Sequence, residues 1–368
     1  MGRVAVAMSG GVDSSTAAAL LRQEGHEVVG LTLQLWDYGA FNTERGLGRC
    51  CSPADIADAR AVAAQLDFPH YVFDHTSAFQ AEIVEPFLDA YAAGDTPSPC
   101  IRCNRKVKFG LLRRLASSLG AESLATGHYA RLSEQAGRPV LRKGVDAEKD
   151  QSYFLFDVPA AQLRDVRFPI GALSKHQVRE EARRLDLRVA DKAESYELCF
   201  IPDGDKNAFV ERYRPAACEE RIAIRDVSGR SLGHTNGLHR FTVGQRRGLG
   251  VNGGDRLYVL NVDADAASVT VGPPEGLEST TLLAEHCNWL AIDAPQSPLR
   301  VRARIRHRHR EAEAIVVPMR QGCYEVRFSE PQRAVTPGQG VAFYDGDVLL
   351  GGGWISRRSD DDGEAATD

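Results

Sequence analysis

Three cysteines carry the first chemical signal in this sequence. Cys100 and Cys103 form a Cys-x-x-Cys pair, and Cys199 follows far along the chain. Such a pair is half of a metal site, a redox pair, or two buried thiols without a joint function, and an ordinary zinc ribbon would need a second pair, which is absent. Four cationic side chains stand near Cys103 in the sequence: Arg102, Arg105, Lys106 and Lys108. Nearby positive charge favours the nucleophilic thiolate, so the pattern indicates thiol chemistry or metal binding.

A glycine loop near the N-terminus could bind an anion. Residues 9–15 read Ser-Gly-Gly-Val-Asp-Ser-Ser and stand between an apolar run and a helical pattern. The glycines let the backbone approach a ligand closely, and the N-terminus of the next helix offers N–H groups. The loop therefore suits a pyrophosphate, although the Gly-Lys-[Ser/Thr] ending of a Walker A loop is missing. The alternative is an ordinary glycine turn capped by Asp13 or Ser14.

Alternating arginines in residues 301–310 are the strongest sign of a nucleic-acid partner. If this run is one strand, one face carries five guanidinium groups. They belong to Arg302, Arg304, Arg306, Arg308 and Arg310. Guanidinium groups suit phosphate oxygens, and each neutralised phosphate adds affinity through counterion release. The alternative is a solvated strand whose arginines discourage edge pairing.

The elements that must position these residues change in character along the chain. Up to about residue 201, short apolar runs alternate with helical patterns. The expected strands cover residues 4–8, 27–33 and 70–73, and the expected helices cover 13–24 and 54–66, with Ser52 as an N-cap. This alternation predicts an α/β fold with a doubly wound parallel sheet. Later segments are short, strand-like and separated by glycine and proline, which predicts a small mixed, mostly β domain and then a β-barrel.

We therefore expect three domains and a tail. Their ranges are 1–202 (α/β), 203–276 (central), 277–358 (C-terminal β-barrel) and 359–368 (acidic and disordered). A length of 368 residues is too great for one core, and 26 % charged residues without a long apolar run exclude a membrane span. The first residues lack a signal-peptide pattern, so eight cysteines indicate a reducing, cytoplasmic location. The net charge of −5 means that RNA would need a local basic patch.

Several blocks of the sequence resemble known enzymes. Residues 9–15 resemble the PP-loop of the N-type ATP pyrophosphatases, which split ATP between the α- and β-phosphates and adenylate an oxygen. Residues 96–109, Thr-Pro-Ser-Pro-Cys-Ile-Arg-Cys-Asn-Arg-Lys-Val-Lys-Phe, closely resemble the block with the first catalytic cysteine of the bacterial tRNA-specific 2-thiouridylases. Four further blocks agree with that family in order: residues 125–130, 149–155, 195–201 and 239–250. The likeness covers nearly the whole chain.

The resemblance implies a tRNA-uridine 2-sulfurtransferase. With ATP and Mg²⁺ it would adenylate the C2 oxygen of a wobble uridine, replace that oxygen with persulfide sulfur, and release AMP and pyrophosphate. Cys103 would be the nucleophile and Cys199 the persulfide carrier, and the two would join in a transient disulfide. The implied partners are the anticodon loops of tRNAs for Lys, Glu and Gln, and a sulfur-relay protein or cysteine desulfurase as sulfur donor.

The resemblance also implies two sets of binding residues. The ATP-binding set is Ala7, Met8, Ser9, Gly10, Gly11, Val12, Asp13, Ser14, Leu33 and Gly127. The tRNA-binding set is Ser98, Pro99, Cys100, His128, Lys149, Asp150, Gln151, Arg306, His307, Arg308 and Gln339.

One block departs from the family pattern. The family usually has Asn-Pro-Asp where this chain has Ser98, Pro99 and Cys100, so a carboxylate that could act as a base is missing. With Cys103 and Cys199, Cys100 could instead complete three ligands of an iron–sulfur cluster. No function follows for the Cys50-Cys51 pair. Two other functions stay open: a PP-loop ligase or amidotransferase acting on a small metabolite, and a non-catalytic RNA-binding protein.

Overall fold

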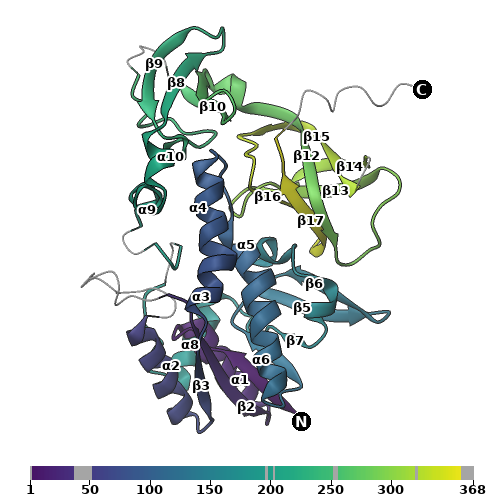
Figure 1. The fold of residues 1–368 in the computed structure, drawn as a ribbon. Helices are drawn as coiled ribbons and strands as arrows, with labels where there is room; N and C mark the ends of the chain where they lie inside the picture. Colours follow the sequence, from purple (N-terminus) through teal and green to yellow (C-terminus); the bar gives the residue numbers. More distant parts are fainter. Residues whose placement is uncertain are drawn as a thin grey trace.

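The described residues form three β-sheets, one parallel and two mainly antiparallel (Figure 1). The computed structural model describes residues 2–36, 52–194, 198–201, 204–251, 256–319 and 322–357. Cys50, Cys51 and the predicted tail at 359–368 lie outside these ranges. No helix among the described residues is long and apolar enough to cross a membrane.

The N-terminal sheet is parallel, as predicted. Its strand order is β3-β2-β1-β4-β7. The bounds are β1 Arg3–Ala7, β2 Glu27–Gln34, β3 His70–Asp74, β4 Ser123–Thr126 and β7 Val166–Arg167. The direction in which strands are added reverses between β1 and β4. In open α/β sheets, ligands bind beyond the carboxyl ends of the strands at such a reversal.

Helices cover both faces of this sheet because alternate side chains of β1 point in opposite directions. Val4 and Val6 join one buried cluster and Ala5 joins another. The first cluster packs under α1 Val12–Gln23, α2 Pro53–Gln65 and α8 Lys175–Arg184. Ser52 caps α2, as predicted, and the structure adds a reciprocal capping box with Asp55.

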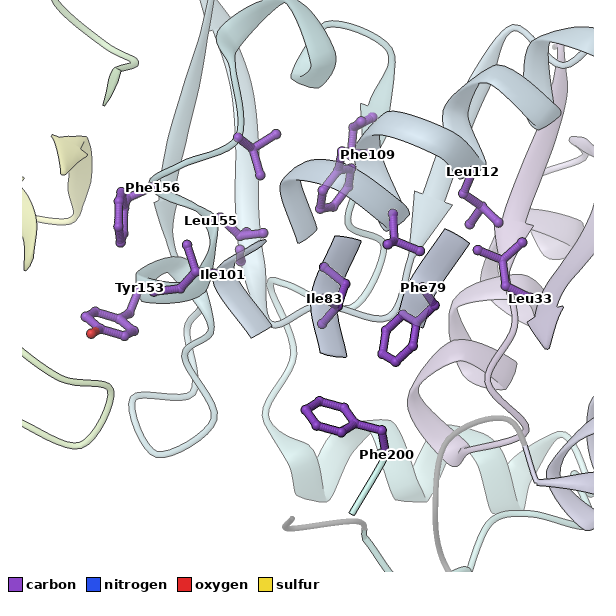
Figure 2. Close-up of a cluster of buried hydrophobic side chains, with 14 of the residues drawn as sticks. Leu33, Phe79, Ile83, Ile101, Phe109, Leu112, Tyr153, Leu155, Phe156 and Phe200 are labelled. Atoms are coloured by element: carbon purple, nitrogen blue, oxygen red, sulfur yellow. The ribbon is translucent and has the colours of Figure 1, made fainter. Parts of the chain in front are cut away.

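The second cluster, which we call the large cluster, lies on the opposite face (Figure 2). Its helices follow one another after β3. They are α3 Thr76–Phe79, η2 Gln80–Val84, α4 Glu85–Ala92, α5 Pro99–Cys103, η3 Asn104–Leu112 and α6 Arg113–Ser118. Figure 2 shows the aromatic rings of Phe79, Phe109 and Phe200 within it. The large cluster continues into the barrel through Tyr344 and Leu349, so the parts of the chain share a core.

The middle of the chain forms a small mixed sheet. Two short helices come first, α9 Lys206–Tyr213 and α10 Pro215–Glu219. The strands are β8 Arg221–Asp226, β9 Ser231–Asn236, β10 Tyr258–Asp263 and β11 Ser268–Gly272, in the order β10-β11-β8-β9. β8 and β11 run parallel, and the other two pairs of these described strands are antiparallel. Phe209 of α9 packs in the large cluster, so the boundary at residue 203 stays a prediction.

The C-terminal strands close into a barrel, which confirms the predicted fold class. They are β12 Glu278–Trp289, β13 Leu299–Arg304, β14 Ala312–Pro318, β15 Tyr324–Arg333, β16 Gly340–Asp345 and β17 Val348–Ile355. The pairing of β12 with β17 completes the ring. The hairpin of β5 Ala130–Gln135 and β6 Arg138–Lys143 joins the outside of this sheet, where Arg142 pairs with Val348.

The predicted strand over residues 301–310 is too long, because β13 ends at Arg304. The backbone then turns, and the N–H of His309 donates to the carbonyl of Arg306 at 3.0 Å. The alternating pattern continues to Ile305, which is buried, so no local pattern marks the end of the strand. Arg306, Arg308 and Arg310 therefore lie in a loop, and the single row of five arginines is wrong.

Candidate functional site

The glycine loop lies between β1 and α1 and is shaped by Ser14. The Ser9 N–H donates to Ser14 Oγ at 3.1 Å, and Ser14 Oγ donates to the Gly11 carbonyl at 3.3 Å. Ser14 is buried, so its hydroxyl holds the loop together. No side chain caps α1 at Gly11. The first turn of α1 therefore presents backbone N–H groups to an anion.

Two glycines bring separate backbones together at this loop. Gly10 has φ +71°, and a Cβ there would lie 2.1 Å from the Asp55 carbonyl oxygen. A Cβ on Gly127, which follows β4, would lie 2.7 Å from the Ser14 nitrogen. Only glycine fits either position. Gly127 thus lies beside the loop, where the sheet order reverses.

Charged side chains surround Asp13 in the first turn of α1. Lys175 Nζ lies 2.8 and 2.9 Å from the two Asp13 oxygens, and Tyr129 OH donates to Asp13 at 2.7 Å. Lys175 also pairs with Glu194 at 3.1 Å, and Glu194 pairs with Lys149 at 2.7 Å. Burial, with the nearby Asp13 carboxylate, raises the pKa of Tyr129, which therefore stays a phenol.

A further lysine fixes the loop from the side of α2. Lys192 Nζ donates to the Gly10 carbonyl at 3.0 Å and contacts Asp55 and Asp58 at 2.6 Å each. Sequence reasoning missed Lys175 and Lys192. Neither belongs to a motif that the sequence shows, and only tertiary folding brings them to the loop.

Cys103 and Cys199 lie against the same hydrophobic core. Cys103 is the last residue of α5, which begins at the buried Pro99, and Cys103 packs on the large cluster. Cys199 packs there too, beside Phe200, whose ring lies 5.8 Å from that of Phe79 (Figure 2). Both thiols are partly buried. Both predicted catalytic cysteines therefore pack against the large cluster.

Cys100 differs from the other two cysteines because its side chain is exposed. In the described part of the chain, no group of three or more His, Cys, Asp or Glu side chains is arranged to hold a metal ion. Three converging thiols are what an iron–sulfur cluster would need. The residues do not fit a cluster as they are placed here.

The cations near Cys103 in the sequence have separate environments. Arg105 lies 2.7 Å from the buried Asp157, and Lys106 lies 3.6 Å from Glu82. Lys108 Nζ instead lies 3.4 Å from Nε2 of His128. These cations are therefore close to Cys103 in the sequence, but they do not all lie beside its thiol in the structure.

His128 is 6 % exposed, so its imidazole lies inside the protein. Its Nδ1 lies 2.6 Å from Thr126 Oγ1, and its ring packs near Phe109 and Phe168 at 5.7 and 5.8 Å. Burial, followed by the charge of Lys108, lowers the pKa of His128 well below its usual value. The ring is therefore neutral at physiological pH.

The tripeptide 149–151, assigned by the resemblance to tRNA binding, has mainly internal contacts. Asp150 is buried and accepts hydrogen bonds from the N–H groups of Gly144 and Ser152, each at 3.1 Å. Gln151 Oε1 accepts from the Tyr129 N–H at 3.0 Å. The structure thus places the Asp150 side chain away from solvent, where it organises the turn.

The C-terminal residues of the tRNA-binding set are of two kinds: some are exposed, and others make contacts inside the protein. Arg306 and Arg308 are exposed. His307 lies between them, with Nε2 3.0 Å from the Asp150 carbonyl oxygen and its ring 4.5 Å from that of Phe154. Gln339 Nε2 donates to the Thr96 carbonyl at 2.6 Å. His307 and Gln339 therefore join the barrel to the N-terminal part, while the two arginines face solvent.

The remaining residues of the predicted sets lie close to these elements. Leu33 is a buried residue of β2 and belongs to the large cluster. Met8 and Val12 are buried at the two ends of the glycine loop. Ser98 precedes α5 and makes no side-chain cap. The set assigned to ATP is thus contiguous with the loop, except for Leu33 on β2 and Gly127, which follows β4.

The fold and the site define a nucleotide-binding α/β protein with two appended β domains. Three family models match it in succession: "tRNA methyl transferase HUP domain" over residues 2–203, "tRNA methyl transferase PRC-barrel domain" over 207–273 and "Aminomethyltransferase beta-barrel domain" over 279–355.

Curated relatives give a more specific assignment. The chain is 49 % identical to the tRNA-specific 2-thiouridylase MnmA of Geotalea uraniireducens (strain Rf4), over 96 % of this chain and 95 % of the relative. It is 49 % identical to that of Magnetococcus marinus and 50 % identical to that of Syntrophotalea carbinolica, with 96 % of this chain and 98 % of each relative covered. The chain belongs to the tRNA-specific 2-thiouridylase family. The resemblance seen in the sequence is confirmed.

Proposed function

We propose that this protein is a tRNA-uridine 2-sulfurtransferase that uses ATP to make 2-thiouridine at the wobble position of tRNA. The proposal rests on two features of the N-terminal part: a glycine loop at one edge of the parallel sheet and two cysteines packed on the large cluster. The glycine loop suits ATP phosphates, and Cys103 and Cys199 both pack on the cluster behind the sheet. The curated relatives named above carry the name of this activity.

The first step activates a poor leaving group. The C2 oxygen of uridine attacks the α-phosphorus of ATP, the bond from that phosphorus to the bridging oxygen breaks, and pyrophosphate leaves with the electron pair. The N–H groups at the start of α1 and the loop around Gly10 would hold the phosphates. The base must leave its stack for this step, because its C2 oxygen is not reachable within the anticodon loop.

The second step delivers sulfur through the two cysteines. The terminal persulfide sulfur on Cys199 attacks C2, the C2–O bond breaks, and AMP leaves. The Cys103 thiolate then attacks the Cys199 Sγ, the sulfur–sulfur bond to the base breaks, and thiouridine is released with a Cys103–Cys199 disulfide left behind. An external thiol must reduce that disulfide. A sulfur-relay protein or a cysteine desulfurase would reload Cys199.

Asp13 is the candidate ligand for Mg²⁺ at the glycine loop, whereas the cysteines do not suit a cluster. Carboxylate oxygens are ligands that Mg²⁺ prefers, but Lys175 contacts both Asp13 oxygens, so Mg²⁺ would have to displace Lys175 from one of them. Bound there, Mg²⁺ would neutralise phosphate charge. The exposed side chain of Cys100 and the lack of a three-ligand group among the described residues do not suit an iron–sulfur cluster. The persulfide route uses only Cys103 and Cys199.

The exposed Arg306 and Arg308 are the side chains best placed to bind tRNA phosphates. The remaining tRNA-binding residues, including Ser98 and Lys149, are proposed on the family resemblance. The tRNAs for Lys, Glu and Gln are the proposed substrates, and the cytoplasm, where tRNA resides, is the proposed location.

The descriptions of the family models mention methyl transfer, but the side chains of this protein favour thiolation. An ATP-phosphate loop and two cysteines on one cluster serve adenylation and sulfur transfer. A small-metabolite ligase is not favoured, because the identity to the thiouridylases extends through the barrel.

Nucleoside mass spectrometry of tRNA from cells lacking the gene tests the function. We expect 2-thiouridine derivatives at the wobble position to disappear and to return with the wild-type gene. Unchanged thiouridine in those cells would contradict the proposal.

A further inference from the structure

Lys108 is a partly buried cation without a counter-ion in the described structure. Its neighbours on η3, Arg105 and Lys106, pair with Asp157 and Glu82. No ion pair between Lys108 and a carboxylate occurs among the described residues, and its Nζ contacts only the imidazole of His128, at 3.4 Å. A partly buried ammonium with no carboxylate partner is costly unless an anion completes the site.

The imidazole that holds Lys108 is itself fixed. His128 is buried, and Thr126 contacts its Nδ1 at 2.6 Å. Since Lys108 donates to Nε2, the proton of the neutral ring is on Nδ1 and points at Thr126. His128 therefore orients the ammonium of Lys108 without neutralising its charge.

His128 stands next to the nucleotide loop. Gly127 touches that loop at Ser14 and Asp13, and Tyr129 donates to the Asp13 carboxylate. The ring of His128 contacts Phe109 and so belongs to the face of the sheet that carries the large cluster. The N-terminus of α1 thus approaches the reversal point of the sheet from one face, and Lys108 approaches it from the other.

Lys108 is also close to the proposed sulfur chemistry. It lies on the π-helix η3, which follows Cys103 directly. The hydrogen bonds of a π-helix join residues five apart, so Lys108 lies about one turn beyond Cys103. Lys108 is therefore linked to the glycine loop through His128 and Gly127, and to Cys103 through η3.

We propose that Lys108 is a further substrate-contacting residue, whose ammonium binds the α-phosphoryl oxygens of ATP, and that His128 is its positioning residue. The inference rests on the proposed function. As the uridine oxygen attacks and pyrophosphate departs, negative charge is shared among the oxygens of that phosphoryl group. A fixed cation on the face opposite α1 therefore stabilises the transition state, where this charge develops, more than it stabilises the ground state.

The test compares Lys108→Met, Lys108→Arg and the control Lys106→Met, which removes an exposed lysine of the same helix. We expect Lys108→Met to lower kcat for tRNA-dependent AMP formation about 10²–10³-fold, as loss of one oxyanion donor does in other enzymes. The KM for ATP should change far less, Lys108→Arg should recover part of the rate, and Lys106→Met should match wild type. If Lys108→Met fails to fold, Lys108→Gln is the replacement.

A second readout separates phosphate contact from a structural effect. ATP analogues with sulfur at either non-bridging α-position form two diastereomers. The wild type should prefer one, and Lys108→Met should reduce that preference. A Lys108→Met enzyme with the wild-type rate, or one that is slow but keeps the full preference, overturns the inference. If the wild type itself forms no AMP with tRNA, it is the proposed function that fails.

Discussion

Arg304 and Asp150 form an ion pair inside the protein. Arg304 Nη1 lies 2.8 Å from Asp150 Oδ2, and the side chains are 13 % and 2 % exposed. Arg304 also contacts Glu311 at 2.9 Å. A strand of the barrel is thus fixed to the turn that follows the β5–β6 hairpin.

Replacing Arg304 should therefore lower stability more than RNA affinity. Arg304→Ala leaves the buried Asp150 carboxylate without its cation, and such a loss costs about 3–5 kcal/mol of unfolding free energy. Urea unfolding measures the change. Arg302→Ala is the matched control, because Arg302 is about half exposed and its ion pairs are longer, at 3.6 and 3.8 Å. Equal losses for the two variants would contradict the assignment.

The exposed arginines should behave in the opposite way. Arg306→Ala and Arg308→Ala should leave the unfolding free energy nearly unchanged and weaken tRNA binding. The slope of log affinity against log salt should fall by about one for each lost phosphate contact. Binding isotherms at several salt concentrations measure it. Slopes equal to that of wild type would mean that these side chains are only solvated.

The role of Cys103 and Cys199 in sulfur transfer should be separable from the binding of ATP and tRNA. Cys103→Ala and Cys199→Ala should each abolish 2-thiouridine formation, because each removes a sulfur atom that the transfer step requires. ATP and tRNA affinities should stay close to wild type, since neither change touches the glycine loop or the exposed arginines. Thiolation assays with a persulfide donor, paired with binding measurements, test both halves. Wild-type sulfur transfer by either variant rules out its assigned step.

Cys100 should be dispensable for sulfur delivery. Because its side chain is exposed and no three-ligand group is formed among the described residues, we expect anaerobically purified protein to be colourless and iron-free and still to thiolate tRNA. Cys100→Ser should then keep near wild-type activity with a persulfide donor. Stoichiometric iron and sulfide, lost together with activity in Cys100→Ser, would establish the cluster instead.

His70 should make stability depend on pH. Burial, and then the charge of Arg60, lower the pKa of His70 to about 4. Its Nε2 lies 2.8 Å from Thr32 Oγ1, whose hydroxyl donates to the Met8 carbonyl just before the glycine loop.

The unfolded chain binds this proton near pH 6.5, so stability is complete above that pH and falls as the pH drops toward 4. Partial exposure limits the loss to about 1 kcal/mol. His70→Asn should flatten the profile by that amount, as urea unfolding between pH 7 and 4 would show. If His70→Asn leaves the pH dependence of stability unchanged, the lowered pKa of His70 is contradicted.

Much of the N-terminal fold could be predicted because its signals are local. The apolar runs at β1, β2 and β3 and the N-cap at Ser52 are short patterns that the structure reproduces within a residue or two. The glycine loop was found for the same reason, since its residues are contiguous.

The remaining features depend on tertiary contacts that no local pattern contains. Lys175 and Lys192 reach the glycine loop from distant segments, so spacing could not reveal them. Arg304 and Arg306 belong to the same alternating pattern, yet one meets Asp150 inside and the other faces solvent. The alternation recorded which side chains could share a face and carried no information about where β13 would end.

Strand β17 has a consequence for how the protein is made. It pairs with β12, with β16 and, through Val348, with Arg142 of β6. Because N-terminal parts of a chain fold first during synthesis, the β5–β6 hairpin must wait on the ribosome with an open edge until β17 emerges. The β6 sequence Arg-Pro-Val-Leu-Arg-Lys places Pro139 and the cations of Arg138, Arg142 and Lys143 on that edge. Proline and positive charge discourage pairing with a neighbouring nascent chain, which keeps the edge open for its own late partner.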